Sequence, residues 1–161
     1  MRVFVSYSAE DEDLKKGLLK HLAPAVRKGT LSSWDRSQVR AGDAPATVIA
    51  AELASAQVAL VLLSASYLDR DGPADEDLGR IAERQAAGGL RVVPVVLSAC
   101  AWRDEPRLRD LQVLPRDGQP IRSRRDRDAA LAQVCHELAA LAPALTAEEP
   151  ASQLRPTAGG T

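Results

Sequence analysis

Two apolar runs constrain the fold of this chain more than any other feature of its sequence. One covers residues 58–63 as Val-Ala-Leu-Val-Leu-Leu, and the other covers residues 90–97 as Leu-Arg-Val-Val-Pro-Val-Val-Leu. A half-exposed strand alternates apolar and polar residues, whereas a continuously apolar strand is buried on both faces. The two runs therefore predict inner strands of a parallel sheet that is covered by helices on both sides.

Shorter apolar segments and helical patterns complete an alternating order along the chain. We expect further strands at residues 3–5, 30–34 and 120–121. Apolar residues recur at helical spacing in four segments, and there we expect helices: Asp11 to Ala25, Pro45 to Ala56, Asp75 to Ala87 and Asp128 to Leu141. Strands that alternate with helices of this length predict a doubly wound α/β domain over residues 1–141. Residues 142–161 have the composition of a disordered tail or linker.

The composition limits the classes of partner. The 161 residues carry 21 Lys and Arg against 22 Asp and Glu, which gives a net charge of −1. Such a chain lacks the positive field that drives generic binding to nucleic acid or anionic membranes. The apolar runs are far shorter than the ~20 residues of a membrane span, the N-terminus has no signal-peptide pattern, and two cysteines are too few for a disulfide framework. We therefore expect a cytoplasmic domain that binds neither nucleic acid nor membrane.

Several familiar catalytic and binding motifs are absent from the sequence. It contains neither a Gly-rich phosphate-binding loop nor a nucleophile elbow around a serine. His21 and His136 belong to separate expected helices, and no Cys, His and Asp cluster has the spacing of metal ligands. We expect neither a metal site nor a resident cofactor.

Four motifs occur in order along the chain. Residues 3–11 are Val-Phe-Val-Ser-Tyr-Ser-Ala-Glu-Asp, and residues 34–43 are Trp-Asp-Arg-Ser-Gln-Val-Arg-Ala-Gly-Asp. Residues 59–68 are Ala-Leu-Val-Leu-Leu-Ser-Ala-Ser-Tyr-Leu, and residues 91–102 are Arg-Val-Val-Pro-Val-Val-Leu-Ser-Ala-Cys-Ala-Trp. Together, at this spacing, they resemble a bacterial-type TIR (Toll/interleukin-1 receptor) domain over about residues 1–141.

The resemblance implies a flavodoxin-like, three-layer α/β fold. The family's sheet has five parallel strands in the order 2-1-3-4-5, with helices on both faces. In an open sheet of this order, ligands bind where strands 1 and 3 diverge, at their carboxyl ends. The resemblance and this general rule therefore indicate one nucleotide pocket, for which the candidate residues are Ser6, Tyr7, Ser8, Trp34, Arg36, Ser64 and Ser66.

The resemblance also implies a substrate, because many bacterial TIR domains hydrolyse NAD⁺ at its nicotinamide–ribose bond. Cleavage develops oxocarbenium character at the ribose, which a fixed carboxylate stabilises. In the family this carboxylate is a glutamate early in the third helix, and an ungapped register puts Asp77 at its place. Aspartate keeps the charge but is one methylene shorter. The alternative is Glu76, which is turned ~100° around the helix from its neighbour.

The family acts through TIR–TIR contacts, commonly through the BB loop. The corresponding residues here are Arg36, Val39, Arg40, Gly42 and Asp43, whose mixed charges and apolar tip suit a head-to-tail contact. We expect a self-associating signalling or effector domain of a bacterial immune-type protein, active in innate immunity such as antiphage defence. The alternative is a catalytically inert adaptor or scaffold, because the family's glutamate position holds Asp77 here. Residues 75–77 also suit the acidic first turn of any helix.

Overall fold

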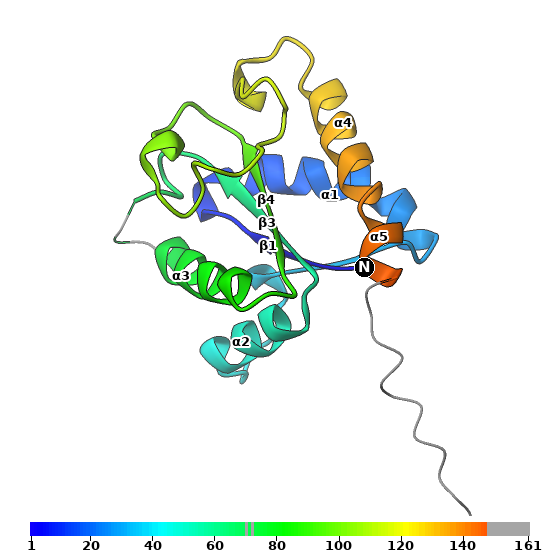
Figure 1. Cartoon of the computed structure of the whole chain (residues 1–161), viewed down its shortest axis with the longest axis vertical. Coiled ribbons are helices and arrows are strands. Elements are labelled where there is room, and N and C mark those ends of the chain that lie inside the picture. The colour runs from blue at the N-terminus through cyan, green and yellow to red at the C-terminus, as the bar shows by residue number, and fades with distance from the viewer. Residues whose placement is uncertain (70, 72, 148–161) are drawn as a thin grey trace, which may run out of the picture.

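A computed structural model describes residues 1–69, 71 and 73–147 and shows a parallel α/β fold (Figure 1). The sheet order is β2-β1-β3-β4. Its strands are β1 (Arg2–Ser6), β2 (Ser32–Asp35), β3 (Val58–Leu63) and β4 (Arg91–Val96), and every pairing is parallel. The predicted alternation of inner apolar strands with helices is confirmed.

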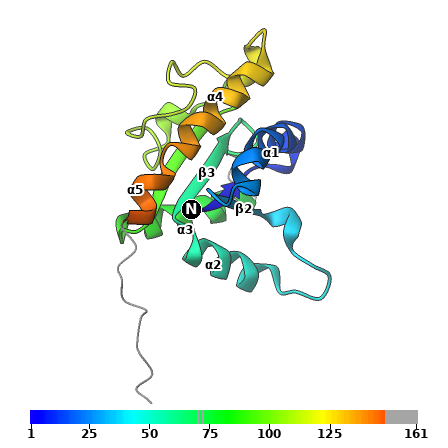
Figure 2. The ribbon, with the colours of Figure 1, turned by 90° about the vertical axis from the view of Figure 1, so that its right-hand side faces the viewer.

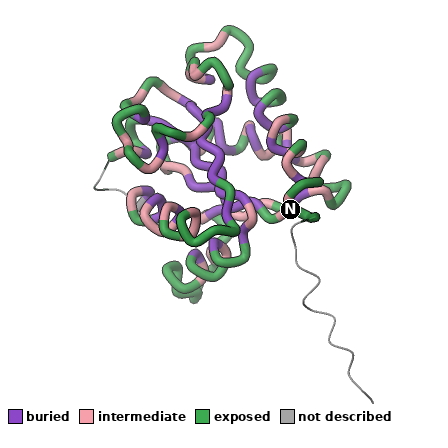
Figure 3. Tube along the Cα trace, in the orientation of Figure 1, coloured by how far each residue is buried: buried purple, intermediate pink, exposed green. Residues whose placement is uncertain are grey.

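Helices cover both faces of the sheet (Figure 2). One face carries α1 (Glu12–Arg27) and α4 (Arg127–Ala139), and the other carries α2 (Pro45–Ser55) and α3 (Pro73–Ala86). All six residues of β3 are fully buried, and they alternate between the two core clusters, with Leu60 on the α1 side and Val61 on the α3 side. The buried strands run through the middle of the molecule in Figure 3, which explains why β3 is apolar at every position.

The predicted five-stranded order 2-1-3-4-5 is wrong in one respect, because the described sheet has four strands. The segment expected to supply the fifth forms a short 3₁₀ helix, η4 (Ile121–Ser123). Pro120 has no N–H with which to continue a ladder. The outer edge of β4 instead pairs at one point with Leu114, whose carbonyl accepts from the Val96 N–H at 2.8 Å and whose N–H donates to the Pro94 carbonyl at 2.8 Å.

A fifth helix, α5 (Ala142–Ala147), follows α4 directly. It covers the first six residues of the segment expected to be a tail, and its Leu145 packs against the core. Residues 148–161 of that segment lie outside the described residues. Both Met1 and α5 lie at the amino end of the sheet (Figures 1 and 2).

The stretch Arg127–Ala147, which joins α4 and α5, is long and apolar enough to cross a membrane by length and composition alone. In this structure the apolar residues of α4, including Leu131, Val134 and Leu138, are buried in the core cluster that also contains α1. Packing against α1 therefore accounts for the apolar stripe of α4.

Candidate functional site

The buried polar side chains among the described residues gather at the carboxyl edge of the sheet. They are Ser6, Asp11, Lys15, Asp35, Ser64 and Asp77. Ser6, Asp35 and Ser64 end or directly follow β1, β2 and β3. Asp11 precedes α1 directly, and Lys15 and Asp77 lie in the first turns of α1 and α3. Because a polar group without a partner is costly to bury, the partners of these residues define the chemistry of the edge.

Asp77 lies in the first turns of α3 and is only 5% exposed. Its Oδ1 accepts a hydrogen bond from Arg36 Nη2 at 2.9 Å, and its Oδ2 accepts one from Ser6 Oγ at 3.4 Å. Burial raises the pKa of Asp77 above its usual range, and the Arg36 guanidinium opposes that shift. The carboxylate is therefore buried, with one charged and one neutral donor.

Two further hydroxyl groups extend this cluster across the ends of β1 and β3. Tyr67 is 1% exposed, and its Oη lies 2.8 Å from Ser6 Oγ. The Tyr67 N–H donates to Ser64 Oγ at 3.1 Å, and the Ser64 hydroxyl donates to Asp11 Oδ2. Two sets of buried hydrogen bonds thus meet at Tyr67, one running from its hydroxyl to Asp77 and the other from its backbone N–H to Asp11, just before α1.

A buried lysine fixes the neighbouring end of β2. Lys15 Nζ lies 2.9 Å from Glu12 Oε1 and 3.4 Å from Asp35 Oδ1, and it sits 4.6 Å from the centre of the Tyr7 ring. Asp35 Oδ1 also accepts from the Ser37 N–H at 2.9 Å, within the turn of η2 (Arg36–Gln38). Lys15 therefore ties α1 to the backbone that carries Arg36.

Each of the three consecutive acids at the start of α3 pairs with a different arginine. Asp75 pairs with Arg107 at 3.0 Å, from the segment after η3 (Trp102–Asp104). Glu76 pairs with Arg80 one turn along the same helix at 2.7 Å, and its side chain is 66% exposed. Of the three, only Asp77 faces β1, so the two candidate carboxylates point in different directions, as the helical period predicts.

The structure brings together some of the nucleotide-pocket candidates and separates others. Ser6 and Arg36 contact Asp77, and Ser64 joins them through Tyr67. Trp34 is half-buried and stacks on Phe4, with ring centres 5.5 Å apart. Three other candidates lie outside this hydrogen-bonded cluster: Tyr7 beside Lys15, half-buried Ser8 and exposed Ser66.

The BB loop candidates divide between the core and solvent. Val39 is half-buried against the core cluster of α2 and α3. Arg40, Gly42 and Asp43 are exposed. The Arg40 N–H donates to Asp43 Oδ2 at 3.0 Å and the Asp43 N–H donates back to the Arg40 carbonyl at 3.1 Å, which closes a tight turn around Gly42 at φ +89°. This turn presents Arg40 to solvent, while Arg36 faces inward.

Sequence reasoning missed Lys15, and it quoted Tyr67 and Asp11 within motifs without naming them as site residues. Tyr67 belongs to the quoted motif at residues 59–68, and an aromatic residue just after an inner strand was the available signal. Lys15 carried no such signal, because a lysine in the first turns of an amphipathic helix ordinarily faces solvent.

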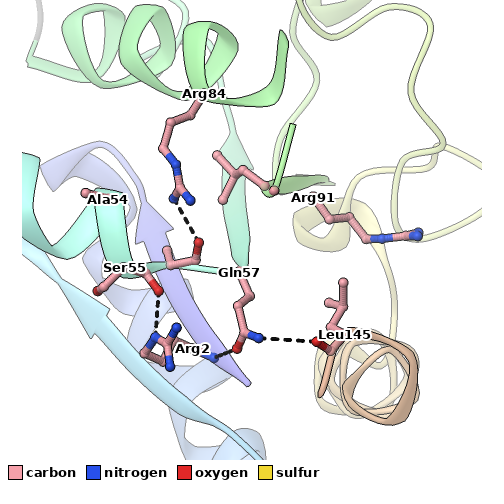
Figure 4. A pocket seen from close by; sticks show the side chains of 10 residues that line it. Arg2, Ala54, Ser55, Gln57, Arg84, Arg91 and Leu145 are labelled. Carbon is pink, nitrogen blue, oxygen red and sulfur yellow. Dashed lines mark hydrogen bonds between the residues drawn. The ribbon is translucent and has the colours of Figure 1, made fainter. Parts of the chain in front are cut away.

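A hollow lies at the opposite end of the sheet from Asp77 (Figure 4). Its volume is about 380 Å³, and it lies between the amino ends of the strands and α5, with Arg84, Arg91 and Leu145 in its lining. Arg84 donates to the Leu53 and Ala56 carbonyls, at the C-terminus of α2. Helix capping accounts for Arg84 there. Within the described residues, no group of three His, Cys, Asp or Glu side chains could hold a metal ion.

Comparisons with known proteins agree with this architecture. A family model described as TIR domain matches residues 3–135. The uncharacterized protein y4lF of Sinorhizobium fredii (strain NBRC 101917 / NGR234) is 33% identical over 159 residues; the match covers 99% of this chain and 49% of that protein, so the chain spans about half of its relative.

A solved structure shares the fold. It is the activated Roq1 resistosome directly recognizing the pathogen effector XopQ, represented by its TIR domains. The TM-score is 0.61 at 17% identity, and the match covers 85% of this chain and 98% of the other.

Proposed function

The chain belongs to the TIR domain family, and on this premise we propose that it assembles with other TIR domains and cleaves NAD⁺ in the assembled state. The reaction breaks the bond between the nicotinamide nitrogen and the ribose carbon. Nicotinamide leaves with the electron pair, and water adds to the ribose with loss of a proton. NAD⁺ is the substrate, and no resident cofactor is needed.

One observation carries this proposal, namely the buried Asp77 carboxylate at the carboxyl edge of the sheet. It touches Ser6, the last residue of β1, where ligands of open α/β sheets bind. A fixed carboxylate in a site sheltered from water stabilises positive charge that develops on the ribose. Asp77 is sheltered, oriented by two donors and placed at that edge.

Arg36 supports the dependence on assembly. In this structure its guanidinium donates a hydrogen bond to Asp77 Oδ1. A cation therefore already lies beside the carboxylate, where the positively charged ribose–nicotinamide group of the substrate would have to bind. Arg36 belongs to η2, at the start of the BB loop. A TIR–TIR contact on residues 36–43 would draw Arg36 away and leave Asp77 paired with Ser6.

A scaffold without enzymatic activity is the second candidate, and a specific observation favours it. Both Asp77 oxygens already have donors, and the ion pair with Arg36 fastens η2 to α3. On this hypothesis Asp77 holds the BB loop in shape for assembly and never meets NAD⁺.

Nicotinamide release measured by chromatography distinguishes the two candidates. The protein is clustered on a fused oligomer, and Asp77→Asn is compared with Glu76→Gln, the matched exposed neighbour. Loss of turnover in Asp77→Asn, but not in Glu76→Gln, supports NAD⁺ cleavage by Asp77. If Arg36 occupies the position of the positively charged part of the substrate, the unclustered Arg36→Gln variant should turn over NAD⁺ faster than the unclustered wild-type protein.

The opposite results are equally clear. The scaffold hypothesis is supported if the clustered protein does not release nicotinamide and if Arg40→Glu prevents the protein from assembling. Turnover that Glu76→Gln abolishes and Asp77→Asn leaves intact would show that Glu76, and not Asp77, is the reacting carboxylate.

We further propose that the domain is the effector part of a bacterial, cytoplasmic immune-type protein. The relative y4lF, about twice as long as the matched segment, leaves room for other domains in proteins of this kind. Survival of bacteria challenged with phage, compared between the intact protein and its Asp77→Asn variant, tests a role in antiphage defence.

A further inference from the structure

We propose that Tyr67, acting through Ser6, is a positioning residue that keeps the Asp77 carboxylate aimed along the end of β1. The inference rests on the proposed NAD⁺ cleavage for its kinetic consequence. The hydrogen-bond relay itself can be tested without substrate.

The direction of the relay follows from the chemistry of its members. An ionised carboxylate only accepts hydrogen bonds, so the Ser6 hydroxyl must donate its proton to Asp77 Oδ2. Ser6 Oγ is then an acceptor for Tyr67 Oη, 2.8 Å away, and Tyr67 is the donor. Burial raises the pKa of Tyr67 far above its usual value, so the phenol keeps this proton at any working pH.

Both members of the relay are buried, Ser6 at the end of β1 and Tyr67 in the turn that follows β3. Ser6 ends β1 and lies opposite Val61 in the ladder with β3. Tyr67 is buried in the core cluster of α2 and α3, and its N–H is held by Ser64 Oγ. Arg36, in contrast, belongs to a short 3₁₀ turn, and its side chain is 39% exposed.

This difference gives the relay its role. When Arg36 leaves, the Ser6 hydroxyl is the remaining hydrogen-bond donor that the described residues provide to Asp77. A carboxylate with a single weak donor turns freely about its last bond, unless that donor is itself held in place. Tyr67 holds the Ser6 oxygen, and a displacement of ~1 Å at a reacting group can cost ~100-fold in rate.

The first test is a ¹³C NMR titration of the Asp77 carboxyl in the Arg36→Gln background, with the signal assigned from Asp77→Asn. Tyr67→Phe keeps the ring and removes only the hydroxyl. We expect both Tyr67→Phe and Ser6→Ala to raise the pKa of Asp77, because each weakens a donor to the charged form. Ser55→Ala, which removes an exposed hydroxyl bonded to the Glu52 carbonyl, is the matched control and should leave the titration unchanged.

The second test measures NAD⁺ kinetics on clustered protein. Tyr67→Phe should lower kcat by about 10-fold or more with little change in KM, because the relay orients a group that acts in the transition state. Thermal melting checks that each variant remains folded.

The outcomes separate the relay from the proposed function. An unchanged Asp77 titration in both Tyr67→Phe and Ser6→Ala overturns the relay, and a change in Ser6→Ala alone overturns the part assigned to Tyr67. Wild-type protein that never releases nicotinamide refutes the proposed function, and the titration then still decides the relay.

Discussion

Replacing Arg36 by glutamine should destabilise the protein in a pH-dependent way. The substitution removes the charged donor from Asp77 and leaves a carboxylate that is only 5% exposed. Glutamine keeps most of the length of the side chain, so loss of packing is small. The variant therefore isolates the contribution of the ion pair between η2 and α3.

The magnitude follows from the exposure of the two partners. Breaking a fully buried pair costs about 3–5 kcal/mol, whereas exposed pairs contribute about 1 kcal/mol or less. Solvent reaches Arg36, whose side chain is 39% exposed, so we expect an intermediate loss. That loss is about 1–2 kcal/mol, which corresponds to a Tm about 2–8 °C lower in a domain of this size.

The sign of the pH dependence comes from the raised pKa of Asp77. A buried acid whose folded pKa exceeds its unfolded value favours the folded state when it is protonated, and that advantage is lost as pH rises through the folded pKa. Without Arg36 the ionised carboxylate lacks its charged donor. The loss of stability should therefore be full at pH 8 and smaller at pH 5.

Thermal melting followed by circular dichroism at both pH values measures this effect. Glu76→Gln is the matched control, since it breaks an exposed arginine–carboxylate pair on α3 and leaves the cations that act on Asp77 in place. The control should lose about 0.5 kcal/mol or less. Equal melting temperatures for the two variants at pH 8 would refute the assignment of a buried ion pair to Arg36 and Asp77.

Three further predictions concern the rest of the fold. Burial raises the pKa of the Cys135 thiol to about 12 and also raises the pKa of half-buried Cys100. Alkylation of both thiols at pH 8 should therefore be slow in the folded protein, slowest at Cys135, and fast in urea. Mass spectrometry of the alkylated protein would show these rates. Arg122 holds the pKa of Asp13 at about 2, below its usual 3.8. Asp13→Asn should therefore lower the free energy of unfolding at pH 6 but not at pH 2, as urea unfolding would show. The loss should be less than about 1 kcal/mol, because Asp13 is exposed. Leu131 lies on α4 and is buried in the core cluster that also contains α1. Leu131→Ala should lower the free energy of unfolding by about 2–4 kcal/mol in the same assay.

Much of the fold could be predicted because it depends on local patterns. The unbroken apolar run of β3 required burial on both faces, and the structure buries every one of its residues. The helices α2 and α4 begin within a residue of their expected starts, at Pro45 and after the Asp126 cap, whose carboxylate accepts from the Ala129 N–H. Parallel topology then brought Ser6 and Ser64 to the same edge.

The remaining features depend on contacts between distant segments. The fifth strand was predicted from a two-residue apolar signal at Pro120, and Leu114 pairs with β4 instead. The Arg36–Asp77 pair joins residues that are 41 positions apart in the sequence, so no local sequence pattern could predict it. Tyr67 was quoted within a motif, yet only the three-dimensional structure shows its ring buried and its hydroxyl beside Ser6.

The positions of Met1 and α5 have a practical consequence for surface immobilisation and sensor design. The Met1 amino group donates to the Thr30 carbonyl at 3.1 Å, and the Leu145 carbonyl accepts from Gln57, next to the first residue of β3. Both anchor points therefore lie at the end of the sheet opposite Asp77. A linker attached after α5 would hold the domain on a chip or scaffold with the Asp77 edge facing solvent, whereas one fused to Met1 would remove the amino group that Thr30 binds.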